Sequence, residues 1–452
     1  MRVNYDSLNE EWRILAEAVL ARAKELGVEL ELKFGAGDTL SVKVRKGELD
    51  ELRQSAPFGV SLRVFKGQRS VSASSSHVDE RSVLELLARA ADNVTLVDED
   101  AANGLPDSDL FFSGTASLEV FDPDVAAVTV DKAIAMATAA EKAAFAVDPR
   151  ITNSSGASVG VNTGATAIYN SLGLAAFQTR SSVSLSVSPV AEESDGEKYS
   201  DGWWHSARFA ADLATPAEVG RIAGERCVAL IGAEKVKTGK FPVVFAPETA
   251  KDLVSLLFSC VSGTAIYKKS TFLTDSEGKA VASDLVTIVD DPLRRRGLGT
   301  DPFDAEGVAT SRQVLVDKGT LKFYPCGTFS ARRLGRKSTG HSGGGNSVTS
   351  HNLYLEAGTT PPEEMLAGVQ EGLFVTAFIG FSFNQATGDF SRGVRGFWVK
   401  DGKLGLPVQE TTVSGNLGQM FKDVVAVGND LAFRFGTDSP TVMIKEMMVS
   451  GA

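Results

Sequence analysis

The 452-residue chain has little cysteine, little histidine and no long apolar run. Its three cysteines, Cys227, Cys260 and Cys326, are far apart and form no CxxC motif, so the sequence has no disulfide framework. No apolar run approaches the roughly 20 residues that a membrane-spanning helix needs. The N-terminal segment MRVNYDSLNEEWRI is acidic and begins a predicted helix, which is not typical of a secretory signal. We therefore expect a cytoplasmic protein with no membrane partner.

Positive charge is also scarce, because the formal net charge is −11. A general nucleic-acid binder needs a basic surface that displaces counterions from phosphates. Two basic clusters exist, at Arg294–Arg296 and Arg332–Lys337, and short clusters of this kind are usually solvated loops. We expect no nucleic-acid partner.

Several nucleotide-binding and hydrolase motifs are missing. No GK[ST] follows the glycine tract Gly340–Asn346, so the tract is not a P-loop, and the sequence has no Rossmann fingerprint. No GxSxG elbow and no Ser-His-Asp order appear. A hydrolase that uses other residues stays open as an alternative function.

The pattern of the first half predicts an α+β domain with antiparallel sheets, residues 1–235. Val28–Phe34 alternates between apolar and polar residues as a half-buried strand does, and Leu40, Val42 and Val44 alternate again. An alanine-rich helix is expected over Asp124–Ala146. Three strands are expected within Thr152–Ser188, with turns at Asn162–Gly164 and Asn170–Gly173.

From Phe241 onward strands dominate, and Gly-containing turns separate them. One exception is a strongly apolar helix from about Glu248 to Ser262, which we expect to be buried. Regular hairpins favour a barrel or a pair of packed sheets. The sequence therefore predicts a mostly-β, barrel-like C-terminal domain, residues 236–452.

An ordered set of segments spans nearly the whole chain and resembles the TldD/PmbA family, also called the modulator-of-gyrase family. The segments are GVSLRVFKGQRSVSASSS (Gly59–Ser76), YNSLG (Tyr169–Gly173), Phe241–Leu273, FDAEGVAT (Phe303–Thr310), STGHSGGGN (Ser338–Asn346), Gly372–Val408 and VAVGNDLAF (Val425–Phe433). The resemblance also implies a curled, barrel-like C-terminal domain.

This family has two kinds of subunit. One carries a metalloprotease HExxxH on the buried helix and a cysteine ligand near the C-terminus, and the other, PmbA or TldE, lacks them. Without gaps, the HExxxH positions fall on Ser255, Leu256 and Cys260. Zinc needs three protein ligands, and the reaction needs a general base, which Leu256 cannot be. Val427–Ile444, where the cysteine ligand is expected, contains no cysteine.

The resemblance therefore implies a non-catalytic subunit of a two-subunit metalloprotease that processes or degrades unfolded peptides and small proteins. It implies no cofactor in this chain, zinc in an HExxxH-bearing TldD-like partner, and peptide substrates. The alternative is a stand-alone homodimeric protein that binds peptides or regulates. The sequence offers no support for direct DNA contact behind the gyrase name.

The glycine tract is the candidate lining of a cleft, because the resemblance places it beside the peptide-holding cleft of the active subunit. Its residues are Gly340, His341, Gly343, Gly344, Gly345 and Asn346. Backbone N–H groups of such a tract can also cradle an anion. The alternative is a mobile surface loop.

Three further candidates are interpreted as structural. His341 and His351 could form a metal pair, but histidine pairs without a motif rarely bind metal, so we expect ordinary loop and strand residues. The carboxylates of Asp301, Asp304 and Glu306 could bind a hard cation, but their spacing fits no ligand frame. Cys260 has no base or cation within a helical turn, so we expect a buried, inert thiol.

Overall fold

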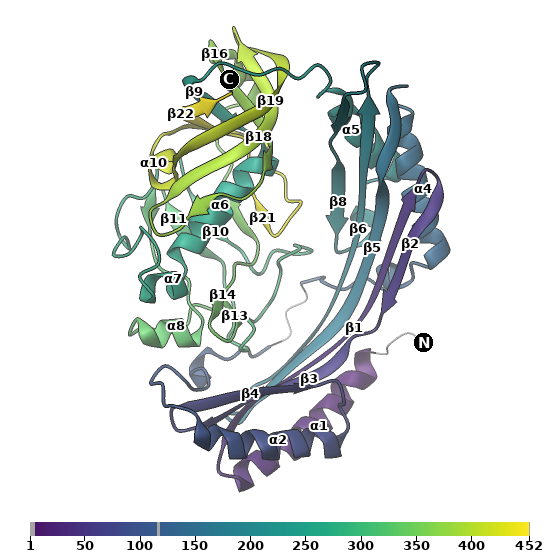
Figure 1. The fold of residues 1–452 in the computed structure, drawn as a ribbon. Coiled ribbons are helices and arrows are strands. Elements are labelled where there is room, and N and C mark those ends of the chain that lie inside the picture. Colours follow the sequence, from purple (N-terminus) through teal and green to yellow (C-terminus); the bar gives the residue numbers. More distant parts are fainter. Residues whose placement is uncertain (1–4, 115–117, 452) are drawn as a thin grey trace.

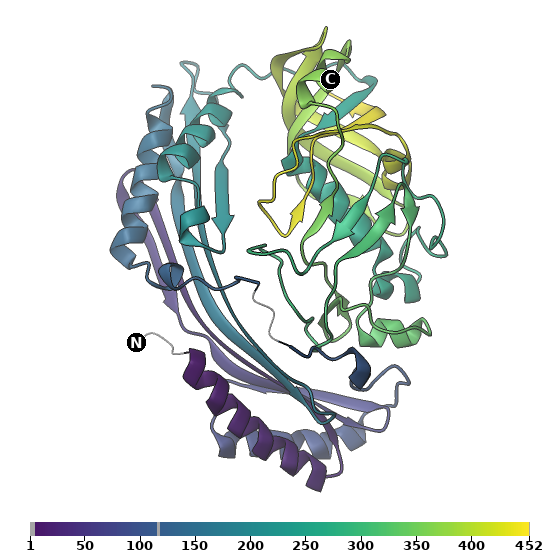
Figure 2. The same ribbon diagram turned by 180° about the vertical axis from the view of Figure 1, so that it is seen from behind.

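The computed structural model describes residues 5–114 and 118–451. An N-terminal part built on a long antiparallel sheet curves around a C-terminal part built on a β-barrel (Figures 1 and 2). The protein is therefore α+β, as the sequence predicts. The helices are α1 (Tyr5–Glu25), α2 (Glu80–Asn93), α3 (Pro123–Ala126), α4 (Val130–Phe145), α5 (Pro216–Val228), α6 (Pro247–Val261), α7 (Gly263–Tyr267), α8 (Thr328–Arg333), α9 (Pro362–Ala367) and α10 (Leu417–Lys422).

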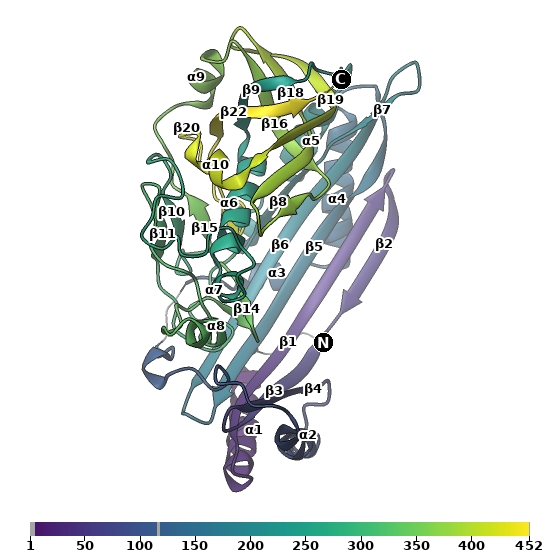
Figure 3. The same cartoon turned by 60° about the vertical axis from the view of Figure 1, so that its left-hand side comes forward.

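The N-terminal sheet has the order β4-β3-β1-β5-β6-β7, with β2 paired to β1 and β8 paired to β6. Its strands are β1 (Glu29–Arg45), β2 (Glu48–Ser55), β3 (Phe58–Lys66), β4 (Arg69–Ser75), β5 (Ile151–Asn170), β6 (Ala175–Glu192), β7 (Lys198–Ser200) and β8 (Trp203–Ala207). The long strands β1, β5 and β6 run the length of the sheet (Figure 3).

Alternation of apolar and polar residues in β1, before and after Gly35–Asp38, separates the two faces of this sheet. Leu30, Leu32 and Phe34 are buried under α1 and α2, while Val42 and Val44 are buried under α4. The pair α1 and α2 and the pair α4 and α5 both cover the outer face of the curve (Figure 1). The inner face carries small and polar residues and is turned towards the C-terminal part.

Two details differ from the sequence prediction. The helix expected over Asp124–Ala146 is interrupted, because the Thr129 side chain accepts a hydrogen bond from the Lys132 N–H and caps a new helix, α4. The expected turn at Asn162–Gly164 is instead strand, since Thr163 pairs with Asp38 and Gly164 with Gly37. One long hairpin, β5–β6, therefore replaces three strands.

The C-terminal barrel closes because β16 pairs with both β9 and β18, which completes the ring β16-β9-β22-β19-β18. Its sheet contains β9 (Gly239–Phe245), β16 (Glu371–Ile379), β17 (Phe383–Asn384), β18 (Asp389–Lys400), β19 (Lys403–Asn416), β20 (Val424–Val427) and β22 (Val442–Ser450). A second sheet contains β10 (Ile288–Asp290), β11 (Gln313–Asp317), β12 (Thr320–Leu321), β15 (Leu353–Leu355) and β21 (Thr437–Asp438), and β13 (Ser342–Gly344) with β14 (Ser347–Val348) forms a separate hairpin.

Helix α6 contributes to one apolar core that also contains strands of both C-terminal sheets. Leu253, Val254, Leu257 and Val261 are buried there, so the apolar sequence of this helix reflects its position between the sheets. No helix in the described ranges is long and apolar enough to cross a bilayer.

Candidate functional site

The positions that the resemblance aligns with HExxxH lie on different sides of α6. Ser255 and Leu256 are partly exposed, whereas Cys260 is fully buried. The Ser255 carbonyl oxygen accepts a hydrogen bond from the Ser259 hydroxyl at 3.0 Å. Burial raises the pKa of the Cys260 thiol to about 12, so the thiolate that binds metal is disfavoured.

The segment expected to carry the third zinc ligand does lie against α6. Arg434 reaches the helix, with its Nη1 at 3.3 Å from Oε1 of Glu248. Asp438 is buried beside it and accepts hydrogen bonds from the backbone N–H groups of Arg434 and Phe435 at 3.0 and 3.1 Å. The segment in which the resemblance implies a cysteine ligand contains no cysteine, and it contacts α6 through the guanidinium of Arg434. The residues at these positions do not fit a zinc ion.

The glycine tract forms the hairpin β13–β14. Gly344 and Gly345 turn it with φ of 93° and 60°, a left-handed conformation that suits glycine. The Thr264 hydroxyl donates to the carbonyl oxygen of Asn346 at 2.6 Å and ties the tip to α7. Gly343, Gly345 and Asn346 are exposed, while His341 is buried at the base of the hairpin. The role of the tract in lining a cleft stays a prediction.

At that base the structure brings three side chains together: Asp290 at the end of β10, His341, and His351 before β15. His341 Nε2 lies 3.1 Å and His351 Nδ1 lies 2.8 Å from the same carboxylate oxygen, Oδ2 of Asp290. Only 1%, 1% and 5% of the surfaces of Asp290, His341 and His351 are exposed. We call these three residues the buried triad.

Electrostatics favours the charged forms of Asp290 and His351. Burial alone would raise the pKa of Asp290, but its interactions with the two imidazoles outweigh burial and lower the pKa to about 2. Burial alone would lower the pKa of His351, yet its hydrogen bond to Asp290 raises it above the usual value. Sequence reasoning considered the two histidines but missed Asp290, which carries no local signal because only strand pairing brings β10 beside β15.

The carboxylates of TDPFDAEG connect segments of the chain. Asp304 is buried and accepts hydrogen bonds from the backbone N–H groups of Glu306, Val308 and Ser342 at 2.9, 3.1 and 2.9 Å. Burial, reinforced by the charge of Glu306, raises the pKa of Asp304 to about 7. Asp301 instead pairs with Arg180 of the N-terminal sheet at 2.9 Å. These contacts agree with a structural loop.

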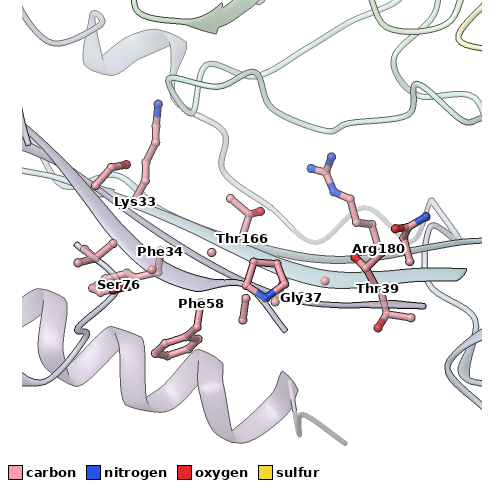
Figure 4. A pocket seen from close by; sticks show the side chains of 18 of the residues that line it. Lys33, Phe34, Gly37, Thr39, Phe58, Ser76, Thr166 and Arg180 are labelled. Atoms are coloured by element: carbon pink, nitrogen blue, oxygen red, sulfur yellow. The ribbon is translucent and has the colours of Figure 1, made fainter. Parts of the chain in front are cut away.

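A groove of about 790 Å³ follows the inner face of the N-terminal sheet (Figure 4). Lys33 and Arg180 project from it towards the C-terminal part, and small residues such as Gly37 and Thr166 line the floor between them. We call this feature the inner groove. Both cations are already paired within the chain, Lys33 with Glu31 at 3.1 Å and Arg180 with Asp301 at 2.9 Å, so the groove offers an extended ligand its backbone and small side chains.

Comparisons with known proteins match this architecture along the chain. Family models described as PmbA/TldA metallopeptidase domain 1, central domain and C-terminal domain match residues 30–94, 123–231 and 238–451. The metalloprotease PmbA of Escherichia coli O157:H7 is 35% identical over 97% of this chain and 96% of its own length. The chain thus belongs to the PmbA/TldD metallopeptidase family.

Solved structures share the fold. A crystal structure of a proposed modulator of DNA gyrase from Bacteroides thetaiotaomicron has a TM-score of 0.90 and 29% identity, over 98% of this chain and 99% of that one. TldE from Thermococcus kodakarensis has a TM-score of 0.85 at 21% identity, over 97% and 100% of the two chains, and at that identity it supports the fold alone.

Proposed function

We propose that this chain is the non-catalytic, PmbA/TldE-type subunit of a two-subunit metalloprotease that processes or degrades unfolded peptides and small proteins. One observation carries the proposal: α6 presents Ser255, Leu256 and a fully buried Cys260 where the active subunit needs two histidines and a glutamate. Without a metal-bound water on α6, this chain has no activated oxygen there to attack a peptide bond.

The catalytic zinc belongs to the partner in this proposal, a TldD-like paralogue that carries HExxxH. Subunits that share a fold can use one surface for self-pairing and for pairing with a paralogue. The E. coli relative is itself named a metalloprotease, which is consistent with membership of an active assembly. The pair works in the cytoplasm.

The inner groove and the exposed tip of the glycine tract are the parts of this chain that we assign to the substrate. An extended peptide can be held largely through its main chain, which makes binding tolerant of sequence. Lys33 and Arg180 project into the space that such a peptide would occupy.

Reconstitution tests the proposal. This chain and an HExxxH-bearing paralogue from the same genome are purified separately and mixed with an unfolded casein-type substrate. Cleavage that a chelator abolishes should appear in the mixture and be absent from this chain alone. The matched control is the same mixture in which the glutamate of the partner's HExxxH is replaced by Gln.

The alternative is a stand-alone homodimeric protein that binds peptides or regulates. It is favoured if the paralogue is fully active by itself and never co-elutes with this chain. Chelator-insensitive cleavage by the pure chain would contradict both proposals and would indicate a hydrolase with unrecognised residues.

A further inference from the structure

The buried triad has a feature that an ordinary hydrogen-bonded cluster lacks. His341 Nδ1 lies 3.0 Å from the carbonyl oxygen of Thr339, and a carbonyl can only accept a hydrogen bond. Nδ1 also lies 2.8 Å from the Thr339 hydroxyl, so two oxygens of Thr339 hold this side of the ring. The other ring nitrogen, Nε2, faces Asp290.

This nitrogen is aimed at an anion. Nε2 of His341 lies 3.1 Å from Oδ2 of Asp290, yet it is buried and makes no well-aligned hydrogen bond within the described part of the chain. Two electron-rich atoms that face each other in a buried site are unfavourable unless a positive charge lies between them. Since buried polar atoms are nearly always satisfied, an unpartnered imidazole nitrogen at this place needs an explanation.

We propose that Asp290, His341 and His351 bind one divalent first-row transition-metal ion of the Zn²⁺ type. The chemistry of the donors decides the class, because imidazole nitrogens and a carboxylate suit Zn²⁺ and Fe²⁺ better than Mg²⁺ or Ca²⁺. Ligand atoms about 2.0–2.2 Å from a tetrahedral ion are roughly 3.3 Å apart. The two N···O separations in the triad, 3.1 and 2.8 Å, are somewhat shorter than that spacing.

The surroundings of the triad are those of a supported metal site. The Thr339 carbonyl orients His341, and Oδ1 of Asp290 accepts the backbone N–H of His351 at 3.0 Å. Such outer partners fix the tautomer and the direction of metal ligands. The rings of Phe258 and Phe323 pack 6.2 and 6.0 Å from the His341 ring and keep the site apolar on that side.

The three ligands come from three separate segments, so the ion would join them. It ties the end of β10 to the base of the glycine hairpin and to the start of β15. This role is structural, and it is distinct from the catalytic zinc of the partner. With this ion, the expected absence of metal applies to α6 alone. The proposed site does not depend on whether the chain pairs with a paralogue.

The test uses the full chain without a histidine tag, stripped with a chelator and titrated with Co²⁺ and then Zn²⁺. We expect one equivalent to bind, a visible Co²⁺ absorption band that Zn²⁺ removes, and an increased melting temperature. X-ray absorption of the zinc-loaded chain should show nitrogen and oxygen ligands and no sulfur. Absence of stoichiometric binding overturns the proposal, and so does a sulfur ligand, which would point to a cysteine.

Variants locate the ion. His341→Gln and Asp290→Asn should lose the Co²⁺ band and the thermal shift, while the matched control His77→Gln, at an exposed position in the N-terminal part, should keep both. An unchanged band in folded His341→Gln overturns the assignment. Should both triad variants fail to fold, the absorption spectrum of the wild-type chain decides, because two imidazoles and no sulfur are required there.

Discussion

Nε of Arg208 donates a hydrogen bond to the carbonyl oxygen of Gly297 at 3.1 Å and so joins the N-terminal sheet to the C-terminal part. The same guanidinium donates from Nη1 to the carbonyl oxygen of Ser181 at 3.2 Å. Only 6% of Arg208 is exposed, and burial lowers its pKa to about 10. Backbone carbonyl oxygens from both parts of the chain therefore hold this buried guanidinium between them.

Arg208→Lys should destabilise the protein by roughly 1–3 kcal/mol, because an ammonium cannot satisfy the separated carbonyls that the planar guanidinium reaches. Urea unfolding measures the change. Arg81→Lys is the control, since Arg81 is exposed and forms its ion pair with Glu85 of its own helix. Equal effects of the two substitutions would show that Arg208 does not bridge the parts.

Stability should fall as pH rises from about 4 to about 7. The folded pKa of Asp304, about 7, lies above its unfolded value near 4, so the native state binds more protons in this window and loses that advantage as pH rises. Glu306→Gln should flatten the decline, because it removes a second carboxylate whose pKa is also raised by burial. Melting temperatures measured across this pH range, with Glu11→Gln as an exposed control, provide the comparison.

The Cys260 thiol should be inert in the folded chain. It is fully buried and its pKa is raised to about 12, so almost no thiolate is present at pH 8. Iodoacetamide labelling read by peptide mass spectrometry should leave Cys260 unmodified until urea is added. Rapid labelling of the native chain at this position would contradict the buried placement.

Gly396→Ala should destabilise the barrel by roughly 1–3 kcal/mol through overpacking. A Cβ at this position would lie 1.9 Å from the carbonyl oxygen of Phe374 on the neighbouring strand, which is backbone and cannot move aside cheaply. Gly35→Ala is the matched strand control, because nothing lies within 4 Å of its added methyl. Chemical unfolding of both variants should separate them.

Division into units 1–235 and 236–452 stays a proposal that proteolysis can test. Lys235 and Lys237 lie between α5 and β9, and both are exposed. Brief trypsin treatment should cut there first and give two fragments that denaturing gels resolve. First cuts inside β5 or β6 would argue against this boundary.

Sequence patterns predicted more of the fold than of the candidate site. Alternation in Val28–Phe34 and again from Leu40 predicted strands, but Gly35–Asp38 concealed that they form one strand, which pairing with β5 keeps continuous. Helix α6 followed from its apolar composition. The buried triad could not be predicted, because it depends on the pairing of β10 with β15 and on a hairpin that places His341 beside them.

The closed barrel also sets an order of events during synthesis. Strand β22, which ends at Ser450, pairs with β9 and with β19 and so completes the ring. Strand β9 is synthesised about two hundred residues before β22, so it is made long before that pairing partner exists. The edge of β9 that β22 covers therefore stays unpaired throughout that interval, and an unpaired strand edge is a site where incomplete chains can associate wrongly.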